Sequence, residues 1–137
     1  MREILFRGKQ IYDNGKWIIG HYACRYGTHY IYFPKTNPYS FDYEYIIPET
    51  VGQYTGLTDK NGIRIFEGDI VKVSDNYGYT DFSDGGIGNV GFYDGLWYVS
   101  GEVNNGLNDL TKVYYVEVIG NIHDNPELMK GESDNAR

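Results

Sequence analysis

Short stretches in which apolar and polar residues alternate, separated by glycine-containing turns, run along most of the chain. Asn14-Gly15 and Asp94-Gly95 each separate two such stretches, and these dipeptides favour the positive φ angles of a tight hairpin turn. Tyr26-Gly27-Thr28 is expected to form another reversal between two strands. The pattern therefore predicts antiparallel strands joined by tight turns, which is an all-β fold.

The amino-terminal part, residues 1–47, is predicted to form a β-meander. Its strands are expected at Ile4 to Tyr12, Trp17 to Arg25 and His29 to Phe33, with a further short strand at Tyr43 to Ile47. Both faces of the strand at Trp17 to Arg25 are largely apolar or aromatic, which predicts that both faces are covered.

The segment from Gln53 to Val73 organises the rest of the chain. It starts with a short strand and a turn at Asp59 to Gly62, where the Asp59 side chain is expected to accept a hydrogen bond from the backbone two residues on. A second strand, a break at Glu67 to Asp69 and a β-branched run at Ile70 to Val73 follow.

The second half of the chain predicts more strands and one short helix. Ser74 to Gly88 has no sustained period and is expected to be a long exposed loop. Thr111 to Ile119 is predicted as the longest strand, after a hairpin formed by residues 89–93 and 96–99. Asn125-Pro126-Glu127 starts a short helix that ends near Met129, because it combines an N-cap, a proline and an acidic residue. Residues 131–137 are expected to be a flexible tail.

Composition narrows the classes of function. The 137 residues include 15 Tyr and carry a net charge of −7, which repels nucleic acid and anionic membranes. Cys24 is the single cysteine, so an internal disulfide is excluded and a reducing cytoplasm is expected. No membrane span or signal peptide is expected.

Two residue groups could carry chemistry, and both are expected to be structural. His21, Cys24 and His29 are zinc-type ligands, but His21 and Cys24 project to opposite faces of one strand. Glu67 and Asp69 resemble an acid and base pair, but they flank Gly68 at a strand entry and are expected to form a solvated turn. No catalytic, cofactor-binding or metal-binding residues are therefore predicted, and the protein is not expected to be an enzyme.

One further motif has the spacing of a dinucleotide-binding fingerprint, Gly86-x-Gly88-x-x-Gly91. The fingerprint needs a helix after it, whereas Phe92 to Gly95 predicts a strand and a turn. Nucleotide binding is not expected here.

Aromatic residues are the remaining candidates for function. Tyrosine and tryptophan are enriched in protein interfaces, and acidic residues around the loop tyrosines disfavour base stacking. The predicted interaction surface contains Tyr77, Tyr79, Phe82, Tyr54 and Trp97.

The chain resembles the YopX family of small phage and prophage proteins, whose function is uncharacterised. The resemblance rests on four segments, residues 1–9, 14–20, 48–71 and 118–128. It implies an SH3-like β-barrel, self-association and a bacterial cell that carries a phage or prophage. The expected organisation is a meander at 1–47 packed on a small SH3-like barrel at 48–130, as one compact unit.

The leading hypothesis is a non-enzymatic, protein-binding β-barrel module that forms homo-oligomers, has no cofactor and is cytoplasmic. The alternative is a nucleic-acid-binding accessory protein of a mobile element, since small barrels often bind nucleic acid. A continuous basic groove would favour that alternative, and its candidate residues are Arg2, Arg7, Lys9, Arg64 and Lys72.

Overall fold

The computed structural model describes residues 3–35, 37, 39–83 and 85–129. The chain is mostly β and divides into two compact units, Met1–Gly56 and Leu57–Arg137. The boundary falls inside strand β5, whereas the sequence suggested residues 47 and 48. The predicted flexible tail, residues 131–137, lies outside the described residues.

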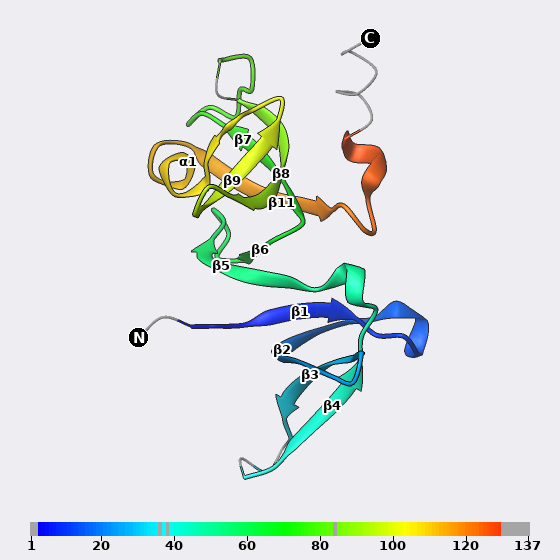
Figure 1. The fold of residues 1–137 in the computed structure, drawn as a ribbon. Helices are drawn as coiled ribbons and strands as arrows, with labels where there is room; N and C mark the ends of the chain where they lie inside the picture. The colour runs from blue at the N-terminus through cyan, green and yellow to red at the C-terminus, as the bar shows by residue number, and fades with distance from the viewer. Residues whose placement is uncertain (1–2, 36, 38, 84, 130–137) are drawn as a thin grey trace. The chain divides into compact units, whose positions relative to one another are not determined.

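The first unit is the predicted β-meander (Figure 1). Its strands pair in the antiparallel order β4-β3-β2-β1-β5, and two 3-10 helices lie in the connections. The elements are β1 (Phe6–Lys9), η1 (Asp13–Gly15), β2 (Trp17–Arg25), β3 (Thr28–Pro34), β4 (Phe41–Tyr45), η2 (Pro48–Thr50) and the start of β5 (Gly52–Thr58).

The meander curls around a small core. Ile31 and Ile46 are 0% and 1% exposed, and an isolated bridge joins Gln10 to Ile46, so the end of β1 meets the end of β4. Glycine permits this close approach, because a Cβ atom on Gly8 would lie 2.2 Å from Cγ2 of Ile46.

The second unit contains a five-stranded antiparallel sheet in the order β10-β9-β8-β7-β11, while β6 extends the other sheet next to β5. Its elements are β6 (Arg64–Phe66), β7 (Asp69–Ser74), β8 (Gly86–Tyr93), β9 (Leu96–Gly101), β10 (Asn105–Gly106), α1 (Leu107–Val113), β11 (Tyr115–Asn121) and η3 (Pro126–Met129). In these orders neither sheet closes on itself, so the predicted SH3-like barrel is not confirmed.

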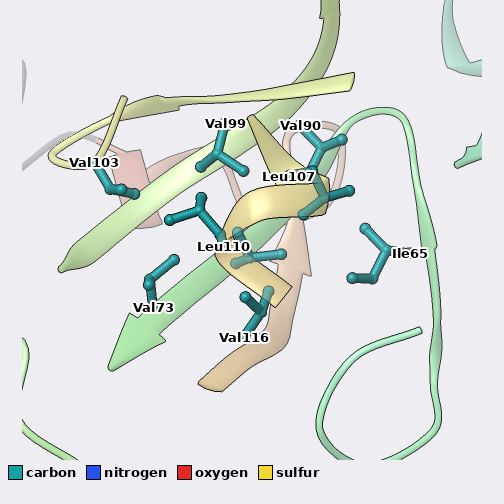
Figure 2. Packing of buried hydrophobic residues seen from close by; sticks show 9 residues of the cluster. Ile65, Val73, Val90, Val99, Val103, Leu107, Leu110 and Val116 are labelled. Atoms are coloured by element: carbon teal, nitrogen blue, oxygen red, sulfur yellow. The ribbon is translucent and has the colours of Figure 1, made fainter. Parts of the chain in front are cut away.

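The strand predicted at Thr111 to Ile119 is wrong in its first part, where the chain forms helix α1. Leu107 and Leu110 are 0% and 1% exposed, and Figure 2 shows them among Val99 and Val116 of the sheet. Two leucines three positions apart share one helix face, and their burial outweighs the turn signals of the preceding asparagines. The strand begins only at Tyr115.

Two of the predicted turns are present, whereas Asn14-Gly15 lies in the 3-10 helix η1 and β1 ends at Lys9 rather than at Tyr12. Asp94-Gly95 and Tyr26-Gly27 both join paired strands with positive φ at each residue. The segment between β7 and β8 is the expected long loop, and the short C-terminal helix is present as η3. Among the described helices, none has the length and apolar character that crossing a membrane requires.

Candidate interaction surface

One face of the first unit's sheet gathers aromatic side chains. In the strand register, Tyr30 pairs with Tyr45 and Tyr32 pairs with Tyr43. Since residues two apart on a strand point to the same side, all four rings lie on one face. Phe41 of β4 and Trp17 of β2 lie on the same face of the sheet as these tyrosines. We call it the tyrosine face.

The tyrosines on this face pack against one another. Five ring pairs among Tyr30, Tyr32, Tyr43 and Tyr45 have centroids 5.5, 5.9, 5.9, 5.9 and 5.6 Å apart and interplanar angles of 75, 66, 54, 50 and 77°. Edge-to-face contacts of this kind fix the rings in place. Even so, Tyr43 remains 46% exposed and Phe41 55% exposed, so the cluster presents ordered aromatic surface to solvent.

Basic side chains lie on the same face, over Trp17. The guanidinium carbon of Arg7 is 4.7 Å from the Trp17 ring centroid, and Nζ of Lys9 is 5.9 Å from it. These are cation–π contacts, which position both charges above the sheet.

Two residues of the predicted interaction surface are exposed on the loop between β7 and β8. Tyr77 is 85% exposed and Tyr79 is 61% exposed. Their backbone N–H groups both donate to Oδ1 of Asp75, at 2.8 and 3.0 Å, which orders this turn. They remain candidates for binding.

The other three predicted residues are largely structural. Tyr54 is 8% exposed, which leaves little surface for a partner. Phe82 stacks on Tyr114, and both Phe82 and Trp97 pack against the core of the second unit. Tyr54 is buried because β5 pairs with β1, a contact that local sequence does not reveal.

The structure brings together two of the three residues that were considered as metal ligands and rejected, and it separates the third from them. Cys24 and His29 are register partners, and Sγ of Cys24 lies 3.7 Å from Nε2 of His29. His21 pairs with Tyr32 and lies on the opposite face of β2. Within the described part of the chain, no cluster of three or more metal-ligand side chains occurs.

Tyr22 completes a short chain of contacts with this pair. Its hydroxyl shares a 2.5 Å hydrogen bond with Nδ1 of His29. Burial raises the pKa of Tyr22 above its ordinary value, and the charge of Cys24 raises it further. The two-residue turn at Tyr26-Gly27 sets the pairing of Cys24 with His29, whereas the reversal expected over residues 26–28 would shift the register by one position.

The structure contradicts the prediction that Asp69 lies in a solvated turn. It is 1% exposed, and its Oδ2 accepts a hydrogen bond of 2.7 Å from the backbone N–H of Phe66. A buried carboxylate that accepts a backbone N–H stabilises the turn before β7. Gly86 to Tyr93 is strand β8 throughout, so the fingerprint-like glycines precede no helix.

A polar hollow of about 330 Å³ lies in the second unit, lined by residues of the Asp59 turn, α1 and β11. Lys60 at its wall pairs with Glu117 at 3.9 Å. The Asp59 carboxylate there accepts backbone N–H groups of Asn61, Ile63 and Val118. The polar groups of this wall therefore have structural roles.

The fold and surface define a small two-unit β protein with an exposed aromatic face. A family model described as YopX protein matches residues 6–130. The chain therefore belongs to the YopX family, which confirms the resemblance seen in the sequence.

A solved structure is also similar. The crystal structure of protein EF1440 from Enterococcus faecalis aligns with a TM-score of 0.61 and 23% identity, covering 94% of this chain and 99% of that one. At this identity the similarity shows a shared fold. No curated protein matches the sequence.

Proposed function

We propose that this protein is a non-enzymatic module that binds another protein through the tyrosine face. The observation that supports this proposal is the cluster of Tyr30, Tyr32, Tyr43 and Tyr45, which remains partly exposed on one sheet face. Tyrosine, tryptophan and arginine are enriched among the residues that dominate binding energy in protein interfaces.

The packing of the cluster favours binding energetically. Each tyrosine ring is already held by its neighbours, so these tyrosines lose little side-chain entropy when a partner covers them. Tyr43 lies on β4, the edge strand, where a partner can approach without displacing another strand. At Tyr45 the edge is already bonded, because the backbone oxygen of Tyr45 accepts the N–H of Ile11.

Capture from bacterial lysate tests the proposal with matched variants. The face variant replaces Phe41, Tyr43 and Tyr45 by serine. The loop variant replaces Tyr26, Tyr77 and Tyr79 by serine, so it also removes three exposed aromatic rings. Cooperative urea unfolding of both variants shows that each remains folded.

We expect the wild type and the loop variant to capture the same protein and the face variant to lose it. Loss from the loop variant alone would place binding away from the tyrosine face, on Tyr26 or on the loop between β7 and β8, and would contradict the proposal. A wild type that captures nothing above a blank resin contradicts the proposal.

A further inference from the structure

We infer that the partner is a protein segment that combines apolar or aromatic side chains with carboxylates. This inference rests on the proposed function and adds the chemistry of the partner. Its basis is a separation of charge between the two faces of the first unit's sheet.

The tyrosine face is locally basic. Arg7 and Lys9 of β1 lie over Trp17, and Arg25 ends β2 on the same face. None of the residues that β1 to β4 place on this face is Asp or Glu. The whole chain has a net charge of −7, so the positive charge of this face is opposite in sign to the net charge of the chain.

The acidic residues of β4 lie on the other face. Asp42 pairs with Phe33 and Glu44 pairs with Ile31, whereas the tyrosines of β4 alternate with them. The alternation Phe-Asp-Tyr-Glu-Tyr therefore sends every ring of this strand to one side and every carboxylate to the other.

Positive charge and aromatic rings come from different strands of the tyrosine face. The tyrosines lie on β3 and β4, whereas Arg7 and Lys9 lie on β1 over Trp17, and Arg25 lies at the end of β2. A complementary ligand needs apolar groups at one end and carboxylates at the other. An acidic segment with aromatic or aliphatic residues has this composition.

A single-stranded nucleic acid fits this arrangement less well. Binding of single strands needs free ring faces for the bases and positive charge that follows the phosphates. Here the tyrosine rings pack edge to face with each other, and the Arg7 and Lys9 charges are gathered at Trp17. Charge that is separated from the rings cannot accompany each successive nucleotide.

Addition of a partner strand to the edge of β4 is also disfavoured. The backbone of Ile46 donates to His29 of β3, so alternation turns the N–H of Tyr43 away from β3. That N–H donates to Oδ1 of Asp42 at 2.9 Å. The carboxylate occupies the donor that an added strand needs, so the face is the docking surface.

Fluorescence anisotropy with defined probes tests the inference. The probes are a labelled random copolymer of glutamate and tyrosine, polyglutamate, polylysine and a single-stranded oligothymidylate. The charge variant carries Lys9→Gln and Arg25→Gln. Its matched control carries Lys72→Gln and Lys112→Gln, which removes the same charge from the second unit.

We expect the glutamate–tyrosine copolymer to bind more tightly than polyglutamate. Polylysine, which the net charge of −7 attracts elsewhere on the chain, should not bind more weakly to the charge variant than to the wild type. The charge variant should weaken copolymer binding about fivefold, because each rim charge contributes modestly, and the matched control should not. Higher salt should weaken binding of the wild type.

Other outcomes overturn the inference. Equal loss in the charge variant and its control, or no copolymer binding, would reject an acidic partner. Tighter binding of oligothymidylate than of copolymer would assign the face to nucleic acid. If lysate capture still depends on the tyrosines in these cases, the proposed function stands and only the partner's chemistry is wrong.

Discussion

The carboxylate of Asp59 accepts a hydrogen bond of 3.0 Å from the backbone N–H of Val118, which lies 59 positions further along the chain. Its other oxygen accepts the N–H groups of Asn61 and Ile63, at 2.8 and 3.0 Å. One buried side chain thus shapes the turn before β6 and ties it to β11.

Asp59→Asn should destabilise the second unit by about 2 kcal/mol. Asparagine keeps one oxygen for the turn but presents an amide donor to the N–H of Val118, and an unsatisfied partly buried donor is costly. Urea unfolding followed by circular dichroism measures the loss.

Asp75 provides a matched control for that substitution. It accepts the N–H groups of Tyr77 and Tyr79 on one oxygen, which is the same local pattern, and both of these bonds stay within the loop between β7 and β8. Asp75→Asn should cost less than about 0.5 kcal/mol, because its remaining oxygen serves both bonds. Equal losses at the two positions would contradict a special role for the Val118 contact.

Gly20→Ala should destabilise the first unit by about 2 kcal/mol or more. An added Cβ would lie 2.0 Å from the backbone oxygen of Tyr32, which cannot move without shifting β3. Gly106→Ala is the control, since its Cβ would meet nothing closer than 3.8 Å. Hydrogen exchange should show loss of protection in β2 and β3 for Gly20→Ala alone. Unchanged exchange in those strands would show that the first unit accommodates the methyl group.

Leu110→Ala should cost about 2 to 5 kcal/mol, because it opens a cavity in the core beneath α1. Leu110 is 1% exposed, whereas Val113 in the same helix is 66% exposed. Val113→Ala should therefore change the free energy of unfolding by less than about 0.5 kcal/mol. Similar midpoints for the two variants in thermal unfolding would mean that α1 contributes little to the core.

Local backbone chemistry explains which parts of the fold were predictable. Asp94-Gly95 adopts positive φ at both residues because the Asp-Gly dipeptide itself favours these angles. The Asp59 side chain accepts a hydrogen bond from the backbone N–H of Asn61, as expected. Helix α1 was not predictable in this way, because Leu107 and Leu110 are buried by strands distant in sequence.

The candidate surface was predictable only in part. Alternating tyrosines in β3 and β4 were visible in the sequence, but their convergence depends on the register that pairs Tyr30 with Tyr45. Sequence reasoning chose exposed loop residues such as Tyr77 and missed the sheet face. Tyr54 was chosen for its residue type, although pairing next to β1 buries it.

The hydroxyl group of Tyr45 should titrate above its ordinary pKa. A hydrogen bond to Tyr43 raises the pKa of Tyr45 above its ordinary value of 10.0, with smaller increases from the Tyr43 charge and from burial. The folded state thus prefers the neutral phenol. Its stabilising contribution is complete below pH 10.0 and is lost as the pH rises through the folded-state pKa.

Tyr43→Phe should lower the pKa of Tyr45 toward its ordinary value, because it removes both the hydrogen bond and the neighbouring phenolate. Tyr30→Phe is the control, since the Tyr30 ring contacts Tyr45 at 5.9 Å but its hydroxyl is not a cause of the shift. Titration of ¹³C-labelled tyrosine by NMR measures both variants. If the Tyr45 resonance titrates identically in wild type and Tyr43→Phe, the hydroxyl pair does not form in solution, and the rings are held by edge-to-face packing alone.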